Sequence, residues 1–322
     1  MEEAASRARA GGPIVVFIMG YSRSGSTILA SILGQVDGFV EIGELHHCWR
    51  ALIEGKGKCG CSRQAVDCPV WGKVFEDLVP ERGGEKWLTM MEKQVEQANR
   101  PWRFLRAVVR GHGDQRQIKY ARLLSKLYHR IQLATGARVI VDSSKDPWFG
   151  ALAALAGDVE VRFVHIVRDP RGVYYSRARR EGPESRRGLA EIGAAARVSL
   201  GWVVTNLAAP WVRRFGGPAY VRIGYETMVA QPEKTLSGLL AGLGFPGASL
   251  PLVDELTVRI AAGHSIAGNR SRFRTGLVAL AADDAWKTGL KPTAQRTINL
   301  LAGPWWRKFG PTPYGSQRAE SQ

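Results

Sequence analysis

The sequence predicts a three-layer α/β fold in which a parallel central sheet is flanked by helices, with further helical insertions. Short, continuous, β-branched apolar runs recur along the chain and are typical of fully buried strands. Segments of helical period separate these runs, and such alternation favours a parallel sheet covered on both faces. Neither an internal repeat nor a low-complexity linker is present, so we expect one domain.

The expected strands share this apolar character: 14–19, 39–42, 138–142, 161–167 and, more weakly, 219–223. A helix is predicted over Ile118 to Leu133, where apolar residues recur on one face at helical spacing. We expect the domain to span residues 14–310, with a flexible N-terminus at 1–13 and a flexible C-terminal tail at 311–322.

Composition is that of an ordinary globular protein, since 45% of the residues are hydrophobic and 23% are charged. The apolar run Ile14 to Met19 is far too short to span a bilayer. Charged residues of both signs precede it, which does not match a signal peptide. We therefore expect a cytoplasmic protein without a transmembrane segment.

The chain is strongly basic, with 45 Lys and Arg against 29 Asp and Glu and a formal net charge of +16. Such an excess favours polyanionic partners such as nucleotides, acidic glycans, nucleic acid or an anionic membrane surface. An arginine-rich surface with no such partner explains the same charge. Charge alone therefore selects no function.

The first strand runs directly into a glycine-bounded turn, Gly20 to Thr27, and then into a helical pattern. Such a turn aims several backbone N–H groups and the positive end of the helix dipole at one point. The spacing is that of a Walker A phosphate loop, with a hydroxyl at Thr27. Ser26 stands where the Walker lysine belongs and the basic residue lies at Arg23, which weakens a kinase interpretation.

A second anion contact is predicted where the strand 161–167 ends in Arg168-Asp169-Pro170. Asp169 is a favourable N-cap and Pro170 suits the first helical position, so a helix should begin here. Arg168 then lies at the carboxyl end of a strand, where open α/β sheets bind ligands. An arginine at this place is well suited to bind a phosphate.

These two motifs resemble those of the sulfotransferases that use 3′-phosphoadenosine 5′-phosphosulfate (PAPS). A loop with a basic residue, Ser-Gly-Ser-Thr and no Walker lysine is similar to their 5′-phosphosulfate loop, which implies that five residues bind PAPS: Arg23, Ser24, Gly25, Ser26 and Thr27. An arginine followed eight residues later by a serine resembles their 3′-phosphate signature, which implies that role for Arg168 and Ser176. The resemblance spans about Ile14 to Gly310, with its specific motifs before residue 180.

The resemblance implies transfer of a sulfuryl group from PAPS to an acceptor hydroxyl. Like phosphoryl transfer, this reaction passes through a loose, in-line transition state with negative charge on the leaving oxygen. It needs a base for the hydroxyl and positive charge at the leaving phosphate. We expect no metal requirement, because a sulfuryl group carries less charge than a phosphoryl group.

Glu44 is the expected general base. It follows the strand 39–42 and comes 21 residues after Arg23, a separation similar to that in protein-tyrosine sulfotransferases. His46 and His47 remain rivals, because cytosolic sulfotransferases use a histidine base.

Lys145 lies in a Lys-Asp-Pro sequence just past the strand 138–142. Family members carry a lysine in a similar setting, which implies that Lys145 stabilises the transferring group together with Arg23 and the backbone of its loop. The same strand ends at Asp142 and imitates a Walker B strand, which keeps a P-loop ATP-dependent kinase as the alternative.

A late basic run, Gly268 to Arg274, is similar to the segment with which sulfotransferases close over the nucleotide. Arg270 and Arg272 are the candidates there, although the arginine–glycine pattern of many family members is not reproduced. A solvated basic loop is the alternative.

Four cysteines, Cys48, Cys59, Cys61 and Cys68, lack paired C-x-x-C spacing, so the sequence indicates zinc only weakly and we assign no metal ligand. A cytoplasmic chain should keep them reduced. The Cys-Gly-Cys and Cys-Pro-x-Trp sequences are similar to a loop of some bacterial-type sulfotransferases. We expect a surface loop from Gly55 to Gly72, a candidate substrate lid, with zinc or a disulfide as alternatives.

The acceptor stays open, since a sugar, a lipid-linked glycan, a phenol or a peptide tyrosine would all suit. The helical segment from Leu189 to Phe215 is expected to help form the acceptor pocket. A basic nucleic-acid-binding module is the non-enzymatic alternative, but no recognised nucleic-acid motif is present. We therefore expect no nucleic-acid partner, and the oligomeric state is open.

Overall fold

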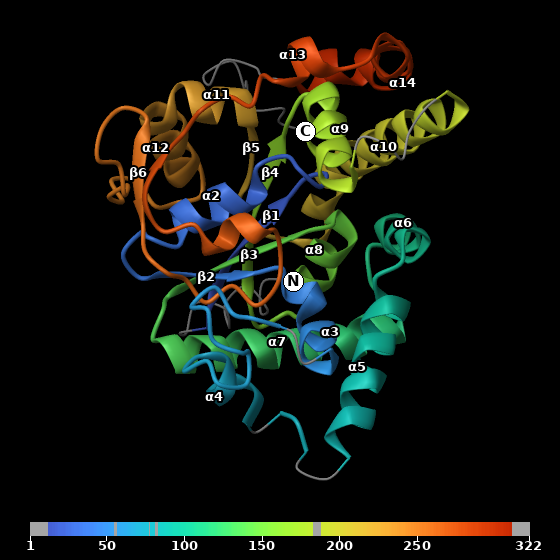
Figure 1. Ribbon diagram of the computed structural model, residues 1–322. Helices are drawn as coiled ribbons and strands as arrows, with labels where there is room; N and C mark the ends of the chain where they lie inside the picture. Colours follow the sequence, from blue (N-terminus) through green and yellow to red (C-terminus); the bar gives the residue numbers. More distant parts are fainter. Residues whose placement is uncertain (1–11, 55–56, 77, 81–82, 183–187, 311–322) are drawn as a thin grey trace.

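The computed structural model describes residues 12–54, 57–76, 78–80, 83–182 and 188–310 (Figure 1). The segments expected to be flexible, 1–13 and 311–322, lie outside these residues except for positions 12 and 13.

A five-stranded parallel sheet forms the centre of the molecule, in the order β2-β3-β1-β4-β5. Its strands are β1 Ile14–Met19, β2 Phe39–Gly43, β3 Val139–Lys145, β4 Glu160–Val167 and β5 Tyr220–Gly224. All five predicted strands are thus confirmed, and the third continues to Lys145 rather than ending before it. Met19 pairs with Lys145 on one side and with His165 on the other, so the carboxyl ends of β1, β3 and β4 lie at one edge.

Helices surround this sheet. The helical segments are α2 Ser26–Leu33, η1 Leu45–His47, α3 Cys48–Ile53, α4 Trp71–Glu76, α5 Gly84–Ala98, α6 Pro101–Arg110, α7 Gln115–Thr135, α8 Pro147–Ala154, α9 Pro170–Glu181, α10 Leu189–Ala208, η3 Ala209–Phe215, α11 Tyr225–Ala230, α12 Pro232–Gly242, η4 Arg270–Phe273, α13 Trp286–Gly289 and α14 Pro292–Phe309. An antiparallel pair that the sequence did not predict, β6 Thr257–Ile260 and β7 Gly276–Ala279, completes the fold.

The predicted helix at 118–133 lies inside α7, and capping explains its longer extent. The Asp114 carboxylate accepts hydrogen bonds from the backbone N–H groups of Arg116 and Gln117, each at 3.0 Å. The Gln117 side chain accepts from the Asp114 N–H in return. This reciprocal cap begins the helix, and Gly136 in a left-handed conformation ends it.

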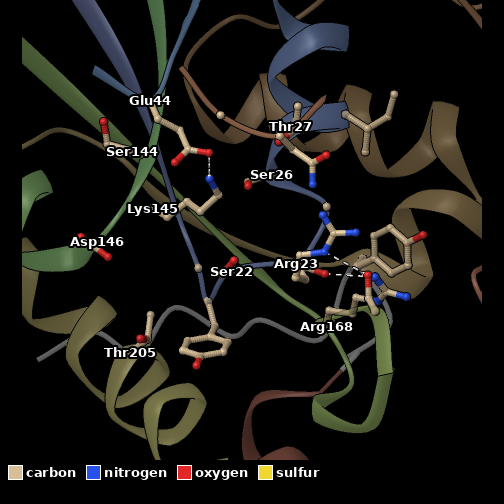
Figure 2. Close-up of a pocket in the computed structure, with 18 of the residues that line it drawn as sticks. Ser22, Arg23, Ser26, Thr27, Glu44, Ser144, Lys145, Asp146, Arg168 and Thr205 are labelled. Carbon is tan, nitrogen blue, oxygen red and sulfur yellow. Dashed lines mark hydrogen bonds and ion pairs between the residues drawn. The ribbon is translucent and has the colours of Figure 1, made fainter. Parts of the chain in front are cut away.

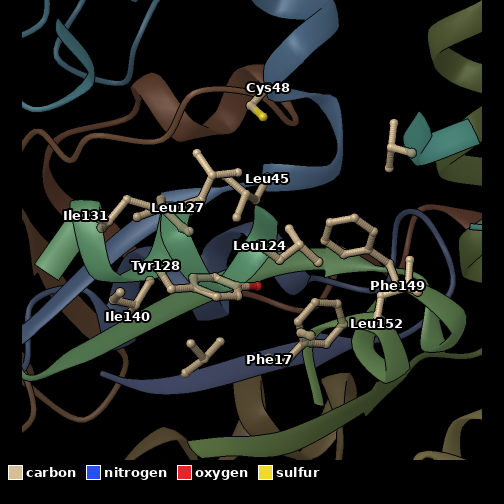
Figure 3. Close-up of a cluster of buried hydrophobic side chains, with 14 of the residues drawn as sticks. Phe17, Leu45, Cys48, Leu124, Leu127, Tyr128, Ile131, Ile140, Phe149 and Leu152 are labelled. Atoms are coloured by element: carbon tan, nitrogen blue, oxygen red, sulfur yellow. The ribbon is translucent and has the colours of Figure 1, made fainter. Parts of the chain in front are cut away.

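Alternating side chains of β1 build the core on both faces of the sheet. Phe17 packs with Tyr128 of α7 and Phe149 of α8 on one face (Figure 3). Ile18 and its neighbours pack on the opposite face with side chains of α2 and α12, such as Leu29 and Leu236. Both faces are therefore covered, as the uniformly apolar strands predict.

One helical run among the described residues, 189–215, is long and apolar enough to cross a membrane by length and composition. It consists of α10 and η3, and Trp202 of α10 is fully buried against Trp306 and Phe309 of α14. Packing on α14 thus accounts for part of its apolar composition. The run is weak evidence for a membrane span.

The expectation of a surface loop from Gly55 to Gly72 holds in part: positions 55 and 56 lie outside the described residues, and 57–70 form turns with both exposed and buried side chains. Cys59 and Cys68 are 0% and 1% exposed, and they pack with Trp71 in the core cluster beneath α3 and α7. Apolar and sulfur-bearing side chains gain by burial, and here they fix the segment to the domain. Such packing argues against a mobile lid.

Candidate active site

A pocket of about 730 Å³ opens at the carboxyl ends of β1, β3 and β4 (Figure 2). Its volume lies within the usual range for small-ligand sites, about 300 to 1,000 Å³. Residues far apart in the sequence line it, and they include eight of the predicted site residues: Arg23, Gly25, Ser26, Thr27, Glu44, Lys145, Arg168 and Ser176. Ser24 is 1% exposed and lies within the same turn.

Two glycines allow the turn between β1 and α2 to lie close to the rest of the sheet. Gly20 has φ 153°, and a Cβ there would be 2.3 Å from the Ile166 carbonyl oxygen. Gly25 has φ 90°, and a Cβ there would be 2.5 Å from the Tyr225 ring. Gly25 caps α2 without a side-chain hydrogen bond, so the first N–H groups of the helix have no side-chain cap at the pocket. This arrangement suits an anion.

The two predicted anion-binding segments meet at this pocket. The Arg23 Nε donates to Ser176 Oγ of α9 at 3.0 Å. The Arg168 Nη1 donates to the Arg23 carbonyl oxygen, also at 3.0 Å, and its guanidinium stacks on the Tyr225 ring at 4.4 Å. The loop after β1 and the junction after β4 therefore face the same cavity.

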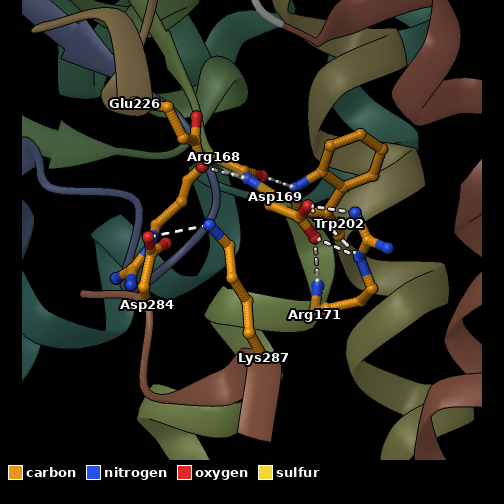
Figure 4. A network of polar contacts seen from close by, with 7 residues as sticks. All are labelled: Arg168, Asp169, Arg171, Trp202, Glu226, Asp284 and Lys287. Atoms are coloured by element: carbon orange, nitrogen blue, oxygen red, sulfur yellow. Dashed lines mark hydrogen bonds and ion pairs between the residues drawn. The ribbon is translucent and has the colours of Figure 1, made fainter. Parts of the chain in front are cut away.

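The backbone at Arg168 is held by several hydrogen bonds (Figure 4). The Trp202 indole donates to the Arg168 carbonyl oxygen at 3.0 Å. The Asp169 N–H donates to Glu226, and the Asp169 carboxylate accepts from the Arg171 N–H at 2.8 Å. The predicted N-cap and the helix start at Pro170 are confirmed. The backbone from which the Arg168 side chain extends is therefore held in place.

Positive charge dominates the pocket. Its cationic side chains are Arg23, Lys145, Arg168, Arg180 and Arg274. Burial lowers the pKa of Arg23, and the neighbouring Arg180 and Arg168 lower it further. Like charges held this close favour a bound anion. Asp283 compensates part of this charge, because its carboxylate lies 3.2 Å from Arg168 Nη2.

Glu44 and Lys145 form an ion pair on one wall, with side chains only 12% and 13% exposed. The Lys145 carbonyl oxygen accepts a hydrogen bond from the Gly20 N–H at 3.1 Å, which joins this wall to the turn from Gly20 to Thr27. Gly268 lies over Glu44, since a Cβ there would be 3.0 Å from Glu44 Oε1. A carboxylate and an ammonium group thus stand side by side, next to the loop.

His46 and His47 also line the pocket, with ring centroids 3.6 Å apart. Burial lowers the pKa of His46 well below its usual value, and the nearby His47 and Lys145 lower it further. Burial likewise lowers the pKa of His47. Both imidazoles are therefore held neutral, and as bases they are weaker than ordinary histidines.

Asp142, the residue that imitates a Walker B aspartate, is not among the described residues that line the pocket. It is fully buried, and it accepts hydrogen bonds from the Tyr128 hydroxyl at 2.7 Å and from the Ser144 N–H at 2.9 Å. Burial raises its pKa to about 6. Asp142 acts as a core hydrogen-bond acceptor here, which removes an observation that favoured a kinase.

Arg270 and Arg272, the candidates on the late basic run, do not line the pocket among the residues described. Arg272 turns away, because its guanidinium donates to the carbonyl oxygens of Gly268 and Lys58 at 2.7 and 3.2 Å. Arg274 of the same run does line the pocket. The sequence located the segment, but the 3₁₀ turn η4 decides which arginine faces inward.

Several lining residues were not identified from the sequence: Asp146, Trp148, Tyr225, Arg274 and Asp283. Asp146 follows Lys145 directly, so the Lys-Asp-Pro motif could have indicated it. Burial raises its pKa to about 6. Tyr225 and Asp283 reach the pocket only through packing of distant segments, and no local pattern marks them.

The structure thus combines a parallel α/β sheet, a glycine-bounded turn and a cationic pocket at the strand ends, an arrangement that suits an anionic ligand. Comparison with family models gives the family: the Sulfotransferase family matches residues 13–249. Because the match covers most of the chain, the protein belongs to the sulfotransferase family and is an enzyme of sulfotransfer.

Solved structures similar to this chain include three sulfotransferases. The sulfotransferase domain from the curacin biosynthetic pathway is 17% identical, with a TM-score of 0.47 over 90% of this chain and 97% of that one. The sulfotransferase domain of the Synechococcus PCC 7002 olefin synthase is 20% identical, with a TM-score of 0.48 over 91% and 95%. Sulfotransferase STF9 from Mycobacterium avium is 13% identical, with a TM-score of 0.47 over 97% and 80%. No functionally curated protein matches the sequence.

Proposed function

We propose that this sulfotransferase takes the sulfuryl group from PAPS and transfers it to an acceptor hydroxyl, with Glu44 as general base. The observation that carries the proposal is the contact between Arg168 and the Arg23 carbonyl oxygen, with Ser176 bonded to the same Arg23. Two candidate anion-binding segments thus face one pocket, which suits a ligand with phosphate groups at two positions. The turn from Gly20 to Thr27 would bind its 5′ end, and Arg168 and Ser176 its 3′-phosphate.

In the proposed reaction Glu44 accepts the proton of the acceptor hydroxyl as that oxygen bonds to sulfur. The bond between sulfur and the bridging phosphate oxygen breaks, and 3′-phosphoadenosine 5′-phosphate (PAP) leaves with both electrons of that bond. Lys145, beside Glu44 and the loop, would stabilise the negative charge on the leaving oxygen. These residues would thus supply a base for the acceptor hydroxyl and a cation for the leaving oxygen.

Glu44 is preferred to His46 as base because the two differ in environment. The pKa of His46 is held well below its usual value by burial and by Lys145, so it would bind the acceptor proton weakly. Glu44 lies against Lys145, and a bound phosphosulfate would attract the Lys145 ammonium group away from it. Release of that ion pair would leave the carboxylate free to accept a proton.

The acceptor's apolar part would bind in a groove of about 610 Å³ that adjoins the pocket. Trp148 and Val204 line both, so the two cavities are continuous. Side chains of α6, α10 and η3 line the groove, and many are exposed: Trp102, Leu105, Val109, Val204 and Trp211. We propose a lipid-linked acceptor whose hydroxyl reaches Glu44 while its chain lies along these side chains.

We expect Trp102→Ala and Trp211→Ala each to raise the KM for a long-chain alkyl glycoside about tenfold. Each indole would contribute on the order of 1.5 kcal/mol of apolar burial to a bound chain. The PAP dissociation constant and the KM for a short-chain glycoside should change little. Leu300→Ala, at an exposed apolar residue outside the groove, is the matched control. Equal losses with both chain lengths would contradict the lipid-linked acceptor.

Thermal unfolding with nucleotides tests the donor. PAP at about 100 times its Kd should stabilise the protein by about 2.7 kcal/mol and raise Tm by a few degrees. ATP with Mg²⁺ should raise it much less, because Ser26 replaces the Walker lysine and Asp142 is buried in the core. A shift with ATP and Mg²⁺ alone would favour a kinase. Salt-sensitive nucleic-acid binding without a PAP shift would favour the nucleic-acid module.

A further inference from the structure

Three cysteines and one histidine meet in a cluster away from the pocket. The ligand atoms of Cys59, Cys61, Cys68 and His264 all lie within 4.8 Å of one another. Cys59 Sγ is 3.5 Å from Cys68 Sγ. His264 Nδ1 is 3.3 Å from Cys68 Sγ and 3.9 Å from Cys59 Sγ.

These separations fit a tetrahedral zinc site. With bonds of about 2.3 Å from zinc to sulfur and about 2.0 Å to nitrogen, tetrahedral ligand atoms stand roughly 3.5 to 3.8 Å apart. Three thiolates and an imidazole form one of the usual structural ligand sets, and soft sulfur ligands select zinc over magnesium or calcium. A disulfide would use only two of the three cysteines and would leave the placement of His264 unexplained.

The backbone holds the four groups in place before any metal binds. A tight turn between Cys59 and Arg63 presents two of the cysteines, with the Cys59 N–H donating to the Arg63 carbonyl oxygen at 2.8 Å. The Trp71 indole donates to the His264 carbonyl oxygen at 2.6 Å, and the Gly60 N–H donates to the Ser265 carbonyl oxygen at 2.9 Å. The first of these bonds joins residues that are 193 positions apart in the sequence.

We propose that Cys59, Cys61, Cys68 and His264 bind one structural Zn²⁺. The three thiols would release their protons on binding, and with the neutral imidazole the complex would carry one negative charge. The Arg272 guanidinium, bonded to the Lys58 carbonyl oxygen next to Cys59, supplies positive charge nearby. All four coordination positions are filled by protein, so the site is closed to substrate.

The metal would hold a segment that lines the pocket. Past His264, the Ile266 N–H donates to the Ile42 carbonyl oxygen and the Glu44 N–H donates to the Ala267 carbonyl oxygen, at 3.0 and 3.1 Å. The chain then enters the run whose Gly268 and Arg274 line the pocket. Zinc would fasten this segment to the Cys59 turn and support the backbone at Glu44. The proposal does not depend on the identity of the sulfuryl donor.

The metal content of the full chain is the test. Protein purified under reducing conditions from zinc-supplemented cells, after gel filtration, should contain one zinc per chain by mass spectrometry of the metal. Cobalt in place of zinc should give thiolate-to-metal charge-transfer absorption and the visible bands of a tetrahedral site. Protein without zinc that also gives no such cobalt spectrum would overturn the proposal, as would a Cys59–Cys68 disulfide in metal-free protein.

Variants locate the metal. Cys61→Ser changes a partly exposed ligand, so it should fold and lose most of the bound zinc, and His264→Ala should do the same. Cys48→Ala removes the one cysteine that is not among the four proposed ligands, and His47→Ala removes a histidine that lines the pocket. Both controls should keep one zinc per chain. Full zinc content in Cys61→Ser and His264→Ala, or its loss in His47→Ala alone, would overturn the assignment.

Discussion

Glu44→Gln is expected to slow sulfuryl transfer about a hundredfold or more, because the amide cannot accept the proton of the acceptor hydroxyl. PAP affinity should be retained or rise slightly, since Lys145 would lose the carboxylate that competes with the ligand for its charge. Single-turnover transfer from PAPS measures the chemical step, and isothermal titration with PAP measures binding. A lower rate with intact binding separates a role in proton transfer from a role in folding.

Glu233→Gln is the matched control for this variant, because Glu233 lies exposed in the first turn of α12. It should transfer at the wild-type rate. If sulfuryl transfer persists in Glu44→Gln, the base is His46 or His47. His47→Ala would then lose more of the transfer rate than Glu44→Gln. The transfer rate of Asp146→Asn is a further comparison with that of Glu44→Gln. The Asp146 carboxyl lines the same pocket, and burial raises its pKa to about 6.

Arg168→Ala should weaken PAP binding by about ten- to a hundredfold. Hydrogen bonds to charged groups contribute about 1.5 to 3 kcal/mol, and 1.4 kcal/mol corresponds to a factor of ten in Kd. Arg168 is 6% exposed, so water would replace its contacts with a phosphate poorly. Titration calorimetry with PAP at fixed ionic strength gives the Kd of the variant and of the wild type.

Arg296→Ala controls for the loss of one positive charge from a strongly basic chain, because Arg296 is exposed on α14 outside the pocket. Its PAP affinity should equal that of the wild type. Arg168→Lys should bind with intermediate affinity, since lysine keeps the charge but loses the planar fork that can bind a phosphate through two N–H groups. An unchanged Kd in Arg168→Ala would remove this residue from the nucleotide site.

The sequence alone determined the elements whose cause is local. The run Ile14 to Met19 is a strand because a short β-branched segment with no polar residue has to be buried on both faces. Asp169 and Pro170 begin a helix through the cap hydrogen bond and the fixed φ of proline. The turn from Gly20 to Thr27 follows from glycines that accept positive φ.

Two strands with weak sequence patterns were not predicted from the sequence. The strands Thr257–Ile260 and Gly276–Ala279 have only four residues each and several exposed side chains. Such short strands carry too little alternation to be recognised. The direction of the Arg272 side chain was not predictable either, because it depends on three backbone carbonyl groups, one of them at the distant Lys58.

Only the tertiary structure decided which residues meet. Arg168 and Arg23 are 145 residues apart in sequence, and Lys145 and Glu44 are 101 apart. His264 joins the cysteine turn from still farther along the chain, which is why the spacing of the cysteines by itself indicated zinc so weakly. Hydrogen-bond and charge contacts between such residues arise from the order of strands in the sheet and from the packing of loops at its edge. Local sequence records the chemistry of each side chain, whereas the fold determines its partners.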